Sequence, residues 1–229
     1  DVWHTAGNWN VNTVPTVNDN VVIPGGRPNY PGTYTSNAQA KTIIVENGGS
    51  INLNDPNRDL VINADLFIEA GGSINAVAVG NNSSDIIITQ DWHNAGTFNA
   101  VQTNVIFNGP ATQTINGATE FFSVEIDNAN GVTIDAAADA RVFGELALVD
   151  GQLTTNDALT IASNNTNTGL IDDFSAGHNG SLVGNITMER WVPNTSAPDP
   201  TYFLFGSPIT PSGLNLASQL SGINLNAVG

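Results

Sequence analysis

The sequence contains no cysteine, few cations and no long apolar segment. Among its 229 residues there are 5 Lys+Arg against 21 Asp+Glu, which gives a formal net charge of −16. A chain with so few cations cannot neutralise a phosphate backbone, and an anionic membrane surface repels it. Its apolar runs fall far short of the ~20 residues that a membrane-spanning helix needs. These absences predict a protein that neither binds nucleic acid nor spans a membrane.

The lack of cysteine rules out disulfide bonds and thiolate metal sites. Charged residues make up only 11% of the chain, so its polarity comes mainly from 32 Asn and 22 Thr, which accompany 23 Gly. Hydrophobic residues make up 40%, which is enough to build a core and argues against disorder. The acidic, lysine-poor balance is typical of a secreted bacterial protein that stays soluble through its charge. We therefore expect an extracellular location.

Helix signals are nearly absent, because no window of the sequence shows apolar residues at the helical period. Short β-branched runs bounded by Asn, Asp, Gly or Ser occur instead along most of the chain, and such runs are typical of strands. Examples are residues 42–45, 60–62, 85–89, 104–107 and 159–161. The sequence therefore predicts an all-β protein.

The strands recur with a repeat of 20 to 24 residues. An apolar strand is followed by a Gly-[Ser/Thr]-[Ile/Phe]-Asn string whose glycines, Gly49, Gly72 and Gly96, are 23 and 24 residues apart. Looser copies surround Gly131 and Gly151. Self-similarity at this period is the signature of a solenoid. We interpret each glycine as supplying the positive φ of a repeated turn, and each Asn as bonding its own backbone or the Asn of the next coil.

The period predicts a right-handed parallel β-helix with roughly 7 or 8 coils, stacked ~4.8 Å apart. The alternative is an antiparallel β-sandwich, which also has short strands but does not explain a constant Gly-Ser-Ile-Asn spacing. Three segments are expected. Residues 1–40 form an irregular N-terminal cap, in which Trp3 and Trp9 cover the first coil; residues 41–192 form the β-helix; and residues 193–229 contain a linker and the start of a following β module.

Several strings match a known class of surface protein. They are Ala6–Asn10, Val14–Thr16 and Val21–Pro24 near the N-terminus, and Gly184–Pro193 followed by Phe203–Pro208 near the C-terminus. In this pattern the chain resembles the large secreted cell-surface β-helix proteins of Bacteroidota, which are adhesin-like. The resemblance implies export by the type IX secretion system, and an outer-membrane secretion and anchoring machinery as partners.

Calcium is the one cofactor that the sequence suggests. Hard oxygen ligands gather around Asp55 and Asp59, and again at Asp172 and Asp173. Alternating Asn and Asp in a turn can supply the carboxylate, amide and backbone oxygens that Ca²⁺ prefers. The alternative is that these turns only satisfy their own backbone. The three histidines lie far apart along the chain and have no histidine partners nearby, so no zinc site is predicted.

An enzyme on the same fold is a further alternative. Asp172–Asp173 with Gly177–His178 resembles the paired aspartates and the Gly-His-Gly string of polygalacturonases, although Asn179 stands at the second glycine. These groups are not one coil apart, as residues that converge on one face of a β-helix must be. A lyase would need ordered cations, and the five Lys and Arg residues follow no repeat register.

The preferred hypothesis is a non-catalytic extracellular module, a stalk or adhesin at the bacterial cell surface that binds glycans or other surface proteins. A polysaccharide-degrading enzyme (lyase or glycoside hydrolase) and a structural spacer or filament subunit are the alternatives.

Overall fold

The structure is a computed structural model that describes residues 1–33, 35–79, 82–172 and 178–191. The chain divides into two units, Asp1–Trp191 and Val192–Gly229. The expected linker and β module at 193–229 lie outside the described residues, as does Asp173. Within the described part, the first unit consists of short strands and a single 3₁₀ turn, η1 (Ala6–Asn8). No helix there is long and apolar enough to cross a membrane.

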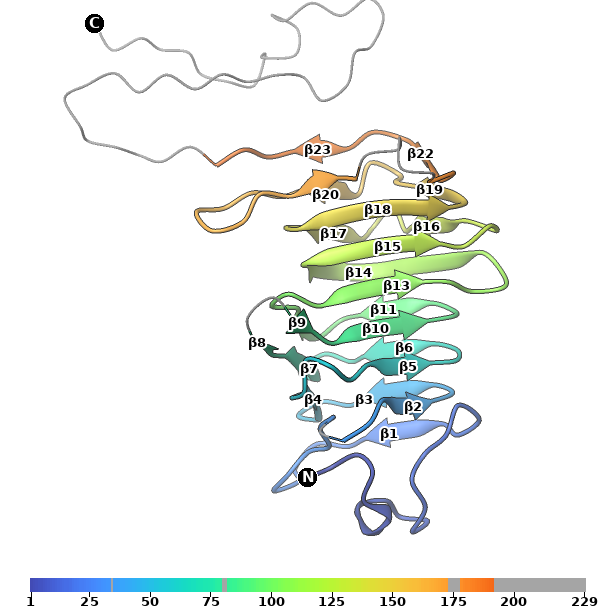
Figure 1. Ribbon diagram of the computed structural model, residues 1–229, viewed down its shortest axis with the longest axis vertical. Coiled ribbons are helices and arrows are strands. Elements are labelled where there is room, and N and C mark those ends of the chain that lie inside the picture. Colours follow the sequence, from blue (N-terminus) through green and yellow to red (C-terminus); the bar gives the residue numbers. More distant parts are fainter. Residues whose placement is uncertain (34, 80–81, 173–177, 192–229) are drawn as a thin grey trace, which may run out of the picture. The chain divides into compact units, whose positions relative to one another are not determined.

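The first unit is a right-handed parallel β-helix of about seven coils (Figure 1). Each coil contributes one strand to each of three faces. Face 1 stacks, in this order, β2 (Ala38–Ala40), β5 (Leu60–Ile62), β10 (Asp85–Ile88), β13 (Asn104–Phe107), β15 (Ser123–Asp127), β18 (Glu145–Asp150) and β21 (Leu170–Ile171). The predicted fold is confirmed, and the antiparallel sandwich is wrong.

Face 2 begins with one additional strand from the N-terminal segment. Its order is β1 (Val21–Ile23), β3 (Ile43–Val45), β6 (Leu66–Ile68), β11 (Trp92–Asn94), β14 (Gln113–Phe121), β16 (Val132–Ile134), β19 (Gln152–Thr154) and β22 (Ser181–Val183). Pairing is parallel and in register, so that Leu66 lies between Ile43 and Trp92 of the neighbouring coils. β1 and β2 both lie within the range expected for the cap.

Face 3 consists of two separate stacks. The first contains β4 (Ser50–Leu53), β7 (Ser73–Ala76) and β12 (Thr97–Asn99). The second starts from the end of the long strand β14 and continues through β17 (Asp139–Val142), β20 (Leu159–Ile161) and β23 (Thr187–Met188). A small antiparallel ribbon, β8 (Ala78–Val79) and β9 (Asn82–Ser83), lies between β7 and β10 along the chain.

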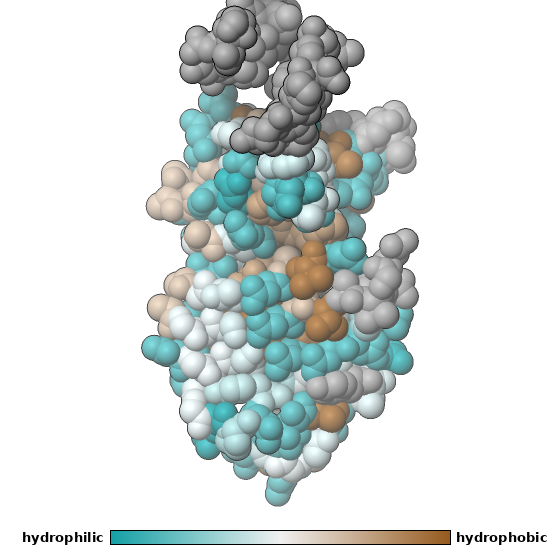
Figure 2. Space-filling view, turned by 90° about the vertical axis from the view of Figure 1, so that its left-hand side faces the viewer, coloured by the Kyte–Doolittle hydropathy of each residue, from teal (hydrophilic) through white to brown (hydrophobic). Residues whose placement is uncertain are grey.

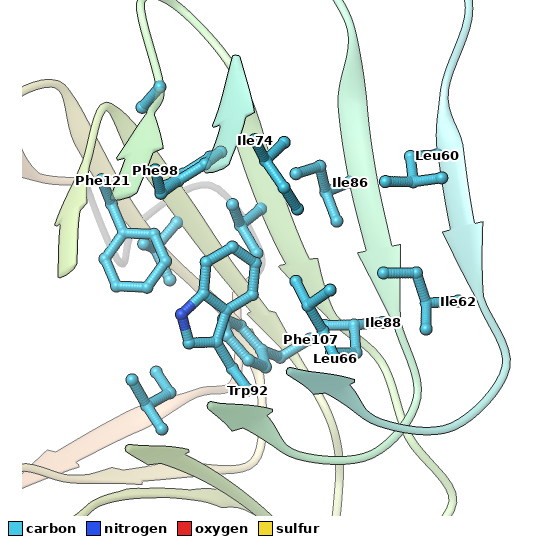
Figure 3. Close-up of a cluster of buried hydrophobic side chains, with 14 of the residues drawn as sticks. Leu60, Ile62, Leu66, Ile74, Ile86, Ile88, Trp92, Phe98, Phe107 and Phe121 are labelled. Atoms are coloured by element: carbon cyan, nitrogen blue, oxygen red, sulfur yellow. The ribbon is translucent and has the colours of Figure 1, made fainter. Parts of the chain in front are cut away.

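The core is built from side chains that alternate between inward and outward positions along each strand. The central strands show a strict alternation of buried and half-buried residues, because successive side chains of a strand point to opposite faces. Inward residues of successive coils then stack, as Leu60 does on Ile86 and Ile62 does on Ile88 (Figure 3). Trp92 and Phe98 occupy core positions of the third coil, as the repeat predicted.

The glycines of the repeat have a different role from the one predicted. Gly48 and Gly71, which precede the template glycines, have positive φ angles of 76° and 84°. Gly49, Gly72 and Gly96 do not; a Cβ atom at Gly96 would lie 2.4 Å from the carbonyl oxygen of Gly72 in the previous coil. The template glycines therefore allow the close approach of successive coils at a corner. The predicted positive φ is found at Gly131 and Gly151.

The N-terminal segment closes the first coil with tryptophan. Trp3 is fully buried in the continuous core, and Trp9 packs partly buried against it with ring centroids 4.9 Å apart. The Nε1 group of Trp9 donates a hydrogen bond to the carbonyl oxygen of Trp3, at 2.7 Å. The expectation that both rings cover the first coil is confirmed.

Candidate functional surfaces

A ladder of uncharged polar side chains covers the first stack of face 3. We call it the polar ladder; it consists of Ser50, Asn52, Ser73, Asn75, Thr97 and Asn99. Pairing places Asn52, Asn75 and Asn99 beside one another in successive coils. The Nδ2 of Asn75 donates to the Oγ of Ser50 at 3.0 Å, and the Nδ2 of Asn99 donates to the Oδ1 of Asn75. Amide contact between coils, one of the two predicted roles of Asn, is confirmed here.

The polar ladder leads into a shallow cleft between the two stacks of face 3. The cleft has a volume of about 290 Å³ and is lined by Asn99, Phe122, Phe143, Asn164 and Asn167, among others. The guanidinium of Arg141 lies 5.7 Å from the centre of the Phe143 ring. Figure 2 shows that the side of the molecule carrying β4 and β7 is mostly hydrophilic, with only small hydrophobic spots. An aromatic cleft at the end of an amide ladder is suited to a ligand with both apolar and hydroxyl groups.

Asp55 and Asp59, two of the predicted calcium ligands, have protein partners. The Oδ1 of Asp55 accepts hydrogen bonds from the backbone and the amide of Asn57, and its Oδ2 lies 3.6 Å from Arg58. The carboxylate of Asp59 accepts from the amide of Asn37 and from the backbone N–H of Asp85, at 2.9 and 3.2 Å. The contacts of Asp55 match the alternative in which the turn satisfies its own backbone, whereas Asp59 bonds groups 22 and 26 residues away. Calcium binding at Asp55 and Asp59 stays a prediction.

Asp172, the third predicted ligand, belongs to a cluster at the C-terminal end of face 1. Its Oδ2 lies 2.9 Å from Nδ1 of His178, and its carboxyl group also hydrogen-bonds Glu145. Burial raises the pKa of Glu145, and the neighbouring charge of Asp172 raises it further, while His178 opposes this shift. The structure therefore brings Asp172 and His178 together. They meet within one segment of the chain and not, as residues of two successive coils would, across a coil boundary. The predicted fourth ligand, Asp173, lies outside the described residues.

Carboxylates also crowd the middle of face 1. Burial raises the pKa of Asp85, and the charges of Asp59 and Glu125 raise it further. Because the pKa in the folded state lies above the unfolded value, the ionised form of Asp85 weakens the fold at neutral pH. This penalty is relieved as the pH falls through the folded-state pKa.

We expect Asp85→Asn to stabilise the protein at about pH 7.5 by less than about 1 kcal/mol, since solvent screens a half-exposed group. The gain should shrink as the pH falls through the folded-state pKa and disappear at about pH 2.5, where the carboxyl group is protonated in both states. Thermal melting of the variant and the unmodified protein at the two pH values measures the difference in stability. Asp127→Asn, which removes an exposed charge from the same face, controls for net charge. An equal gain from both variants would contradict the role of crowding at Asp85.

A third group was not predicted from the sequence. Asp65, Asp91 and His93 lie on face 2, and ligand atoms of all three fall within 4.8 Å of one another. It is the one such group of three acidic or histidine residues found in the part of the chain that the structure describes. His93 has no histidine nearby along the chain, and its partner in the neighbouring coil is Asp65, an aspartate 28 residues earlier. The sequence feature that could have indicated this group is the Asp-x-His string at residues 91–93, combined with the coil period that brings Asp65 beside it.

Comparison with known proteins gives one match. Residues 1–109, less than half of the chain, match a protein family described as a domain of unknown function (DUF8693). The matched segment contains the tryptophan cap, the polar ladder and the Asp65–Asp91–His93 group. No curated protein and no solved structure matches the chain.

Proposed function

We propose that this chain is a non-catalytic module of a protein on the bacterial cell surface, where it serves as a stalk or adhesin that binds glycans. The observation that carries the proposal is the polar ladder, which runs across three coils and ends at the aromatic cleft. Its hydroxyl and amide groups repeat at the strand spacing of about 4.8 Å, which offers donors and acceptors to an extended chain of sugars.

The stacked coils suit the role of a stalk. Parallel pairing joins each coil to the next on faces 1 and 2, and also within each of the two stacks of face 3, and a continuous apolar core runs through the coils. Such a solenoid resists bending, because each coil is held by its neighbours on both sides. The resemblance to Bacteroidota surface proteins supports export to the cell surface, with the outer-membrane secretion and anchoring machinery as partners.

A glycan array probed with the full chain tests the proposal. We expect binding to at least one neutral polysaccharide, and at least a tenfold loss of affinity in Asn99→Ala and in Phe143→Ala, which alter the ladder and the cleft. Thr133→Ala and Thr154→Ala change outward threonines of face 2 and should leave binding intact. Absence of all binding, together with ordered end-to-end association, would favour the structural spacer instead.

The Glu145–Asp172–His178 cluster favours a second candidate, a polysaccharide-degrading enzyme. Its raised carboxyl pKa suits a general acid. However, the two carboxyl groups hydrogen-bond each other, whereas glycosidases hold theirs at least about 5 Å apart. A depolymerisation screen with and without Ca²⁺ decides between the two candidates. Turnover that is lost in Asp172→Asn and Glu145→Gln would overturn the non-catalytic proposal.

A further inference from the structure

We propose that Asp65, Asp91 and His93 bind a divalent first-row transition-metal ion, such as Zn²⁺, which bridges two neighbouring coils of the β-helix. Parallel pairing of β6 with β11 places Leu66 opposite Trp92, so Asp65 lies beside Asp91 in the next coil. Asp91 and His93 are two positions apart and point to the same outward side. All three side chains are half-buried, and their ligand atoms lie within 4.8 Å of one another.

The three side chains are held in place before any ion arrives. The Oδ1 of Asp65 accepts the backbone N–H of Asp91 at 3.1 Å, and the Oδ1 of Asp91 accepts the backbone N–H of Thr114 at 2.7 Å. The imidazole of His93 stacks flat on the ring of Phe67, with centroids 4.5 Å apart. Ligands that are already fixed lose less conformational entropy on binding.

The same three groups still have capacity to bind. Among the described residues, the Oδ2 atoms of Asp65 and Asp91 and both ring nitrogens of His93 have no hydrogen-bond partner. No Lys or Arg of that part of the chain forms an ion pair with either carboxylate. Two carboxylates therefore lie side by side without a counter-cation, in a protein whose net charge is −16.

The ligand set determines the class of ion. An imidazole nitrogen with two carboxylates suits zinc and its neighbours in the first transition row, whereas Ca²⁺ and Mg²⁺ prefer oxygen ligands alone. Three protein ligands leave further coordination positions for water. An ion at this place links the second coil to the third. Its binding does not depend on the glycan proposal.

Titration calorimetry on the untagged full chain, stripped with a chelator and titrated with ZnCl₂, MnCl₂ and CaCl₂, tests the proposal. We expect saturable binding of one Zn²⁺ per chain, tighter than Ca²⁺, with a rise in melting temperature that EDTA reverses. His93→Ala and Asp91→Asn should each weaken binding at least about tenfold. Asp91→Asn keeps an oxygen to accept the N–H of Thr114, so circular dichroism should show an unchanged fold.

His178→Ala provides the matched control, because it removes the other histidine that lies beside an aspartate. It should leave zinc binding unchanged. The proposal is overturned if no stoichiometric binding of Zn²⁺ occurs, if Ca²⁺ binds more tightly, or if His178→Ala abolishes binding while His93→Ala does not.

Discussion

Trp92→Ala is expected to destabilise the β-helix by about 4 kcal/mol, within the range for removing a fully buried tryptophan. Trp92 has no exposed surface and packs against Phe98 and Phe121, with ring centroids 5.1 and 5.3 Å away (Figure 3). Its Nε1 also donates to the buried Oγ1 of Thr119, at 3.1 Å. Truncation removes one of three clustered aromatic rings from the core, and the pairing of neighbouring coils prevents them from closing in on the cavity.

Thermal and chemical unfolding measure this loss. A loss of 4 kcal/mol corresponds to a fall of roughly 10 °C in melting temperature for a domain of this size. The matched control is His93→Ala, which changes the next residue of β11 on the outward side. In metal-free protein it should shift the melting temperature by at most a few degrees. Equal losses from the two variants would mean that Trp92 does not anchor the core.

The fold could be predicted because the repeat records core positions directly. Ile51, Ile74 and Phe98 are equivalent residues of the Gly-Ser-Ile-Asn template, and the structure stacks all three in the core. Each coil of a solenoid repeats the same local structure, so a short repeated string identifies the equivalent residues of successive coils. The period therefore determined the architecture without any information about long-range contacts.

The coil register beyond the first repeats could not be predicted. The inward residues Leu66 and Trp92 are 26 residues apart, whereas Ile74 and Phe98, in the same two coils, are 24 apart. The insertion with β8 and β9 lengthens one corner, and a tighter corner before β12 shortens another. Strand β14 then turns from face 2 to face 3 without a break, and residues 112–117 at its start do not contain the Gly-[Ser/Thr]-[Ile/Phe]-Asn string.

This variation in spacing also explains the missed residues on face 2. Asp65 and Asp91 become neighbours only when the 26-residue spacing is known, because a shift of one position would turn one of them inward. The polar ladder was easier to predict, since its members belong to the repeated string itself. Residues that lie within the repeated string can be placed from the sequence, whereas residues separated by an insertion cannot.

Gly96→Ala is expected to destabilise the protein by about 3 kcal/mol, the upper end of what overpacking costs. An added Cβ would lie 2.4 Å from the carbonyl oxygen of Gly72, 2.5 Å from that of Glu69 and 2.7 Å from Cγ2 of Ile68. Two of these atoms are backbone, and Gly72 belongs to the adjacent coil, so relief requires the two coils to separate. The cost therefore arises from packing between coils, because Gly96 does not have a positive φ angle.

Substitutions at two other glycines test whether close packing between coils, rather than a requirement for positive φ, explains the cost at Gly96. Gly26 has a φ of 70° and no atom within 4 Å of an added Cβ, so Gly26→Ala measures backbone strain alone, about 1 kcal/mol. Gly7 has open space and no positive φ, so Gly7→Ala should be nearly neutral. Denaturant unfolding should rank the losses as Gly96, then Gly26, then Gly7. If Gly26→Ala costs as much as Gly96→Ala, backbone conformation rather than the close approach of coils explains the glycines of the repeat.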